Sequence, residues 1–167
     1  MRGQPVARAQ RKTQPAGYSG TPLAKKLGIR AGARLYLHAA PPNYLQLIAP
    51  APEGVRAVRR IDAHTDLVHL FATRRAQLDK ALHGARTAMR ADAVVWVSWP
   101  KKASRVPTDI SEDVIRELAL PLGLVDIKVC AVDETWSGLK LMLRRSERPT
   151  ATARPVTRGA AGRRARP

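Results

Sequence analysis

The sequence predicts an α/β fold in which helices cover both faces of a mostly parallel, twisted β-sheet, giving a three-layer sandwich with an antiparallel final strand. Segments typical of strands alternate along the chain with segments typical of helices, an order that produces parallel strands joined by right-handed crossovers. Residues 66–72 form a nearly continuous apolar run, as expected for a strand buried on both faces. The last two strand segments have no helix between them, so the final strand should run antiparallel to its predecessor.

The first half of the chain is predicted to contain two short helices and three strands. Thr21 and Pro22 are typical of the cap and first residue of a helix, and Gly28 is typical of its end. Pro50 and Pro52 end the second helix. In order, the predicted elements are a helix at 21–28, a strand at 34–39, a helix at 43–48, a weak strand at 55–60 and the buried strand at 66–72.

The second half continues the alternation. Apolar residues recur with helical spacing over 74–89, which predicts an amphipathic crossover helix, and 93–99 is the clearest strand in the chain. Asp109 and Glu112 have the spacing of a capping box, which predicts the start of the next helix. The remaining predicted elements are that helix at 109–122, a strand at 124–132, a turn at 133–138 and a final strand at 139–144.

The size of the chain fits one domain with two basic tails. A chain of 167 residues, 44% of them hydrophobic, can bury one core, and we expect that domain over 17–147. The formal net charge is +17, yet residues 18–147 hold 20 Lys and Arg against 13 Asp and Glu, so more than half of the excess lies outside them. Residues 1–16 and 148–167 contain bases, no acid and few large apolar side chains, and we expect both tails to be disordered.

Composition also limits the location and the partners that we expect. A polybasic tail attracts nucleic acid weakly and without sequence preference, although solvated filler is the alternative interpretation of these tails. The N-terminus lacks the apolar region of a secretory signal, and no apolar run is long enough to span a bilayer. We therefore expect a soluble, cytoplasmic protein with no membrane partner. The single cysteine, Cys130, excludes an internal disulfide and lies in an apolar run typical of the core.

The order of the elements, with two consecutive strands at the end, resembles the Rossmann-like fold of class I methyltransferases over residues 29–145. Such enzymes bind S-adenosylmethionine at a glycine-rich turn after the first strand and use an acid at the end of the second. Here the turn reads HAAPP at 38–42, and Arg59 and Arg60 close the second strand, with Asp62 as the nearest acid. The resemblance therefore implies the fold without the glycine-rich cofactor loop, and we predict no cofactor.

Three distinctive strings carry a second resemblance. They are GYSGTPLAKKLGI at 17–29, WPKKAS at 99–104 and VCAVDETWSGLK at 129–140. Over residues 17–145 the chain resembles a family of bacterial proteins known as domain-of-unknown-function family 3052. This resemblance implies no activity.

Four unusual segments, 38–43, 73–74, 99–104 and 133–134, follow strands of the predicted sheet. All would lie at its carboxyl edge, where ligands bind in open α/β sheets. Bases there suit a phosphate or carboxylate, the acids would pair with them or hold a hydroxyl or amine, and aromatic rings would supply a stacking wall. The predicted ligand-binding residues are Tyr18, Ser19, Arg74, Lys101, Lys102, Ser104, Asp133, Glu134 and Trp136.

Each part of this candidate site also has an ordinary structural interpretation. The two lysines are consistent with a solvated loop, the two acids with a hairpin turn that caps neighbouring N–H groups, and Trp96 and Trp136 with the core. The four histidines show no spacing typical of metal ligands, and neither Ser19 nor Ser137 lies in a nucleophile elbow. No metal site and no catalytic residue are therefore predicted.

Three functional hypotheses follow from these observations. The favoured one is a non-catalytic domain that binds a small anionic ligand or a protein partner at the carboxyl ends of the strands. The second is an enzyme acting on a small phosphorylated or carboxylated metabolite, with Lys101 or Lys102 as an electrostatic clamp and Asp133 or Glu134 as a general base. The third is a nucleic-acid-associated protein held by its basic tails, although no nucleic-acid-binding motif occurs in the predicted domain.

Overall fold

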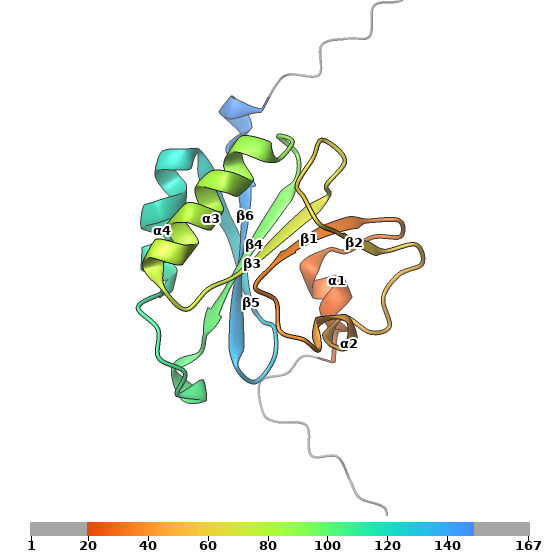
Figure 1. Ribbon diagram of the computed structural model, residues 1–167, viewed down its shortest axis with the longest axis horizontal. Coiled ribbons are helices and arrows are strands. Elements are labelled where there is room, and N and C mark those ends of the chain that lie inside the picture. Colours follow the sequence, from red (N-terminus) through yellow and green to blue (C-terminus); the bar gives the residue numbers. More distant parts are fainter. Residues whose placement is uncertain (1–19, 149–167) are drawn as a thin grey trace, which may run out of the picture.

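Six strands form a single sheet in the order β2-β1-β3-β4-β6-β5 (Figure 1). The structure is a computed structural model that describes residues 20–148, so the expectations for Tyr18, Ser19 and most of both tails lie outside the described residues. Strand β1 is parallel to β2 and β3, β3 is parallel to β4, and β6 lies antiparallel between β4 and β5. The predicted fold class is therefore confirmed, including the antiparallel final strand.

The elements alternate as the sequence predicts. Short 3-10 turns follow β4 and α4. The helices and strands are α1 (Leu23–Leu27), β1 (Arg34–His38), α2 (Tyr44–Leu47), β2 (Arg56–Val58), β3 (Leu67–Phe71), α3 (Arg75–Ala88), β4 (Val94–Pro100), α4 (Glu112–Ala119), β5 (Leu124–Ala131) and β6 (Trp136–Leu143).

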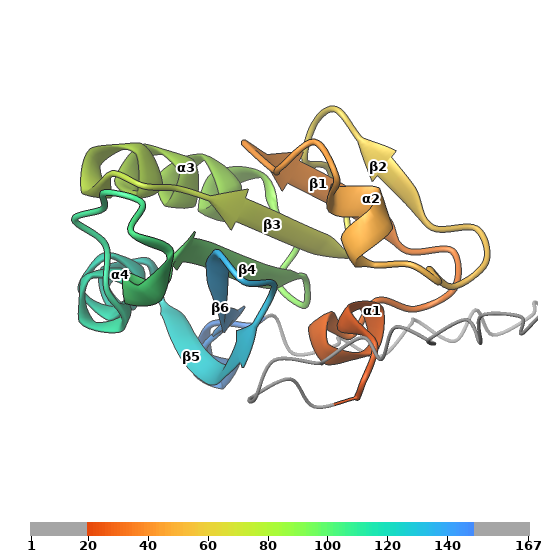
Figure 2. The ribbon, with the colours of Figure 1, turned by 90° about the horizontal axis from the view of Figure 1, so that it is seen from below.

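Helices cover both faces of the sheet, which makes the three layers (Figure 2). Helices α3 and α4 pack on one face, where Leu78, Leu82 and Ile115 are fully buried against β3, β4 and β6. Helices α1 and α2 pack on the opposite face against β1, β3 and β4, and bury Leu27 and Ile48 completely. The two layers leave the α3 side of β1 and β2 without a helix, because residues 59–66 return from β2 to β3 as a loop.

Strand β3 occupies the middle of the sheet, and all five of its residues are buried. Its one polar side chain, His69, is satisfied on both sides: Nδ1 lies 2.9 Å from the Tyr44 hydroxyl and Nε2 lies 2.8 Å from Ser98 Oγ. Burial lowers the pKa of His69 to about 3 and raises the pKa of Tyr44 well above its ordinary value. The imidazole is therefore neutral in the native protein at ordinary pH.

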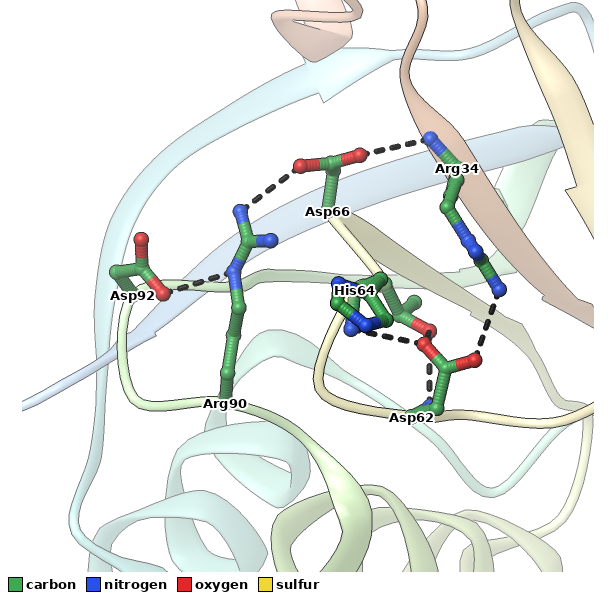
Figure 3. Close-up of polar contacts among 7 residues, drawn as sticks. Arg34, Asp62, His64, Asp66, Arg90 and Asp92 are labelled. Atoms are coloured by element: carbon green, nitrogen blue, oxygen red, sulfur yellow. Dashed lines mark hydrogen bonds and ion pairs between the residues drawn. The ribbon is translucent and has the colours of Figure 1, made fainter.

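A charged network ties together the amino ends of the parallel strands (Figure 3). Asp66 accepts hydrogen bonds from the Arg34 N–H and from Arg90 Nη2, both at 2.8 Å, and Arg90 also lies 2.8 Å from Asp92. Arg34 in turn donates to Asp62 at 2.8 Å. Burial acts to raise the pKa of Asp66, but the hydrogen bonds from Arg34 and Arg90 outweigh it and hold that pKa below its usual range.

The helix caps differ from those predicted. Thr21 does not cap α1, because the helix begins after Pro22 and has no side-chain cap. Ser111, not Asp109, caps α4 by accepting a hydrogen bond from the Val114 N–H at 3.3 Å. The Asp109 carboxylate instead accepts the N–H of Arg75 at 2.6 Å, and so caps the start of α3. A cap donated from a distant segment cannot be recognised from local spacing.

The final strand also starts earlier than predicted. It begins at Trp136, where the sequence indicated a turn up to residue 138, because residues 136–138 pair with the end of β4 and with β5. Gly138 is closely packed there, since a Cβ at this position would lie 3.0 Å from a methyl group of Val132 and 3.3 Å from the ring of the buried Trp96. The glycine that suggested a turn therefore lies within a strand.

The buried histidine predicts a stability that depends on pH. Below about pH 6.5 the unfolded chain binds a proton at His69 that the native state does not bind until about pH 3. Stability should therefore fall as the pH is lowered from 6.5 to 4, and His69→Gln should reduce this slope by up to about 1.4 kcal/mol per pH unit. Urea unfolding at several pH values measures the slope. His83→Gln, at an exposed site on α3, is the control, and an equal slope in both variants would contradict the assignment.

Candidate functional site

The carboxyl edge of the sheet brings two of the predicted segments into contact. The Lys101 N–H, just after β4, donates to the Thr135 carbonyl at 2.7 Å, and Lys101 Nζ donates to the Asp133 carbonyl at 2.5 Å. The end of β4 is thus attached to the turn between β5 and β6. Lys101 meets Asp133 as the sequence predicted, but the contact is with the main-chain oxygen.

The carboxylate of Asp133 is occupied by its own turn. Its Oδ1 accepts the N–H of Thr135 at 2.8 Å and the N–H of Trp136 at 2.7 Å. This is the capping role that the sequence offered as the alternative interpretation. Glu134 is exposed and forms no ion pair or hydrogen bond within residues 20–148.

The other predicted residues lie along the same edge but farther apart. Arg74 is exposed just before α3, and Ser104 stabilises the 3-10 turn after β4 by donating to the Lys101 carbonyl at 2.7 Å. Lys102 is exposed and lines a shallow groove of about 450 Å³ beside Arg116. Trp136 is partly buried, with its ring edge-on to Phe71 at 5.1 Å between centroids.

Aromatic rings fill the α2 side of this edge. Tyr44 meets His69 and Phe71 edge-on, with centroids 5.4 and 5.9 Å apart, and His69 stacks on Phe71 at 4.4 Å. Trp136 completes the cluster through Phe71. Tyr44 is only 2% exposed, so no open space lies over the middle of the sheet here. The sequence placed His69 inside a buried strand but did not single out Tyr44.

An open groove lies on the opposite face, between α3 and the carboxyl ends of β1 and β2. We call it the carboxyl-end groove; its volume is about 640 Å³, within the usual range for small-molecule sites. Tyr36, Leu70 and Ala85 contribute apolar surface. The charged residues that line it are Arg59, Arg60 and Lys80, with His38 at the end of β1.

These groove residues were missed as ligand candidates by the sequence. Arg59 and Arg60 were noted only as the end of the second strand, and Lys80 only as a surface residue of the helix. Two features of the sequence could have indicated a basic groove: two consecutive arginines directly after a short strand, and the absence of a helix before the next strand. Asp62, the acid nearest to them in sequence, lies at the opposite edge, where it pairs with Arg34.

Other kinds of site have less support in the part of the chain that the structure describes. Residues 20–148 contain no cluster of three or more His, Cys, Asp or Glu side chains able to hold a metal ion. None of the helices in this range has the length and apolar character needed to cross a membrane. Cys130 is partly buried, and burial raises the pKa of its thiol.

Comparison with known proteins supports the fold. No family model and no curated protein matches the sequence. A putative type 11 methyltransferase from Sulfolobus solfataricus superposes with a TM-score of 0.55 at 12% identity, covering 75% of this chain and 91% of that one. A SAM-dependent methyltransferase from Aquifex aeolicus gives 0.55 at 11% identity, with coverage of 72% and 87%. DhpI in its complex with SAH gives 0.51 at 12%, with coverage of 74% and 83%.

These solved structures define the class of fold. The chain has the Rossmann-like fold of class I, SAM-dependent methyltransferases, as its element order suggested. At identities of 11 and 12% the likeness concerns the fold and not the reaction. Function must therefore be argued from the side chains of this chain.

The turn at 133–136 yields a direct test of its role. Asp133→Ala removes the acceptor of two N–H groups and should lower the free energy of unfolding by about 1 kcal/mol. The matched change Glu134→Ala should alter it by less than about 0.5 kcal/mol, because this side chain is exposed and has no partner within the described residues. Chemical denaturation measures both. Equal values would show that the Asp133 carboxylate is not a structural cap.

Proposed function

We propose that this chain is a methyltransferase-like domain that binds a small anionic ligand in the carboxyl-end groove and does not transfer methyl groups. The observation that carries the proposal is the charge of the groove: Arg59, Arg60 and Lys80 line it, and no Asp or Glu does. The site lies at the carboxyl ends of β1 and β2, which is where open α/β sheets bind their ligands.

The bases of the groove form no ion pair within the described part of the chain. None of the three forms an ion pair within residues 20–148, where the ion-paired arginines are Arg34, Arg75, Arg86, Arg90 and Arg116. Residues 1–19 and 149–167 contain no Asp or Glu, so these segments have no side-chain carboxylate to offer. A phosphate or carboxylate from outside is the group that guanidinium and ammonium donors recognise best.

The shape of the groove supports a small ligand. It opens because no helix covers the α3 side of β1 and β2, and because α3 presents small residues there, Ala81, Gly84 and Ala88. Parallel sheets are normally covered on both faces, so this stretch of sheet is unusual in having free volume above it. An apolar surface with a basic rim suits a molecule that has an apolar body and an anionic group.

The residues at the usual cofactor position do not fit S-adenosylmethionine. In class I enzymes a glycine-rich turn after the first strand lets main-chain N–H groups approach the cofactor. Here the turn has no glycine, and Pro41 and Pro42 have no N–H to donate. The rings of Tyr44 and Phe71 fill the adjoining space, and two arginines stand after β2 where those enzymes use an acid. These features support a binding domain over a methyltransferase.

The remaining expectations stay proposals. Tyr18, Ser19 and the other predicted residues of the carboxyl edge are predictions that no observation here tests, as is membership of domain-of-unknown-function family 3052. An enzyme acting on an anionic metabolite would need a general base. The carboxylate of Asp133 is already held by its own turn, which leaves the exposed Glu134 as the general base of that alternative. A protein partner or nucleic acid would make binding depend on bases outside the groove as well.

Binding can be tested with a panel of candidate anions. Sugar phosphates, nucleotides and S-adenosylmethionine are added to the full chain, and thermal unfolding shows which of them stabilise it. The Kd of each hit is then measured by calorimetry. The double variant Arg59→Glu and Arg60→Glu should weaken binding by tenfold or more, because it replaces two attractive charges with two repulsive ones.

A matched double variant makes this experiment specific. Arg144→Glu and Arg145→Glu change the net charge by the same amount at another exposed pair of consecutive arginines. This variant should leave the Kd within about twofold, because exposed charges at a distance are screened by salt. Equal losses in the two variants, or no stabilising anion in the panel, would contradict the proposal. Stabilisation by S-adenosylmethionine would contradict the inference that this chain does not bind that cofactor.

A further inference from the structure

A second groove lies at the opposite edge of the sheet, and the proposed function does not use it. It is formed by the loop after α1, the starts of β3 and β4 and the end of β6, and its volume is about 630 Å³. We call it the amino-end groove. Its charged lining residues are Lys25, Arg30, Asp66, Arg90, Asp92 and Lys140.

The two acids of this groove share one arginine. Arg90 lies 2.8 Å from Asp66 and 2.8 Å from Asp92, and Asp66 also accepts the main-chain N–H of Arg34 (Figure 3). Asp66, Arg90 and Asp92 therefore form a compact wall. Arg90 is engaged by both carboxylates, so an anionic ligand would have to use the other three cations of the groove.

The other three cations take no part in these ion pairs. Lys25, Arg30 and Lys140 form no ion pair within residues 20–148, and the segments outside this range contain no acidic side chain. Lys140 is partly buried, and its pKa is lowered first by this burial and then by the positive charges of Lys128 and Arg30. Like charges held this close repel each other, and a bound anion would relieve that repulsion.

The loop that carries Arg30 has a defined conformation. It starts at Gly28 with φ +77° and ends at Gly32 with φ +73°, values that other residues rarely adopt. The Gly32 N–H donates to the Glu53 carbonyl at 2.7 Å, which fixes the far end of the loop. Arg30 is therefore held at the groove near Lys140 by a short loop attached at both ends.

We propose that the amino-end groove is a second binding site, which takes the phosphate group of a small phosphorylated molecule between Arg30 and Lys140. A dianionic phosphate matches two or three cations better than a monocarboxylate does, and arginine binds it in a bidentate manner. The proposal does not depend on the carboxyl-end groove, because the two sites lie at opposite edges of the sheet and share no lining residue.

The lysine itself provides the most direct test. NMR of the lysine side chains follows the titration of Lys140 in the full chain, with and without inorganic pyrophosphate at constant ionic strength. A bound anion favours the charged ammonium, so the pKa of Lys140 should rise on addition of pyrophosphate. Backbone shifts should change at residues 28–33 and 140–142. An unchanged Lys140 titration would overturn the proposal.

A matched pair of variants separates the two grooves. Lys140→Met should weaken pyrophosphate binding at residues 28–33 by tenfold or more, measured by the NMR shifts, whereas Lys80→Met, in the carboxyl-end groove, should leave it within twofold. Arg30→Ala should weaken pyrophosphate binding as well. Because Arg30 lies in an exposed loop, this variant leaves the strand that carries Lys140 unchanged. Equal weakening by Lys140→Met and Lys80→Met would overturn the proposal. Failure of the carboxyl-end groove to bind any anion would leave these results unaffected.

Discussion

The complete burial of β3 is the constraint on which the rest of the structure depends. A strand covered on both faces requires a helical layer on each side, and α3 with α4 and α1 with α2 provide them. It also requires that its polar side chain be satisfied internally, and His69 meets this need through Tyr44 and Ser98. The hydrogen bond to His69 helps to fix the position of Tyr44, the first residue of the short helix α2.

The same constraint explains why the two grooves lie where they do. Tyr44, Phe71 and Trp136 occupy the α2 side of the carboxyl edge, and the two grooves lie at the margins of the helical layers. The two grooves are also distinguished by the charged side chains that line them. Most of the chain's 13 carboxylates are engaged by five arginines or by main-chain N–H groups. Within residues 20–148 the exceptions are Asp79, which contacts His83, and Glu53 and Glu134, which have no such partner. Bases that form no ion pair within this range line both grooves, three in each.

The fold could be predicted from the sequence because its signals are local. The apolar run of β3, the helical spacing of α3 and the absence of a helix before β6 each lie within one segment. Where prediction failed, the cause was a distant contact. Asp109 caps a helix more than thirty residues away, and Gly138 lies within a strand because it pairs with Ser98 of β4 and Cys130 of β5. The grooves could not be predicted either, because they depend on which stretch of sheet the helices leave uncovered.

The place of β6 in the sheet has a consequence for synthesis of the chain. This strand is the last of the six strands to be synthesised, yet it lies between β4 and β5 and pairs with both. A nascent chain that ends before Trp136 has one unprotected edge on β4 and no partner for β5. The sheet is therefore completed only when residues 136–143 have emerged, and until then its unpaired strand edges are exposed to other chains.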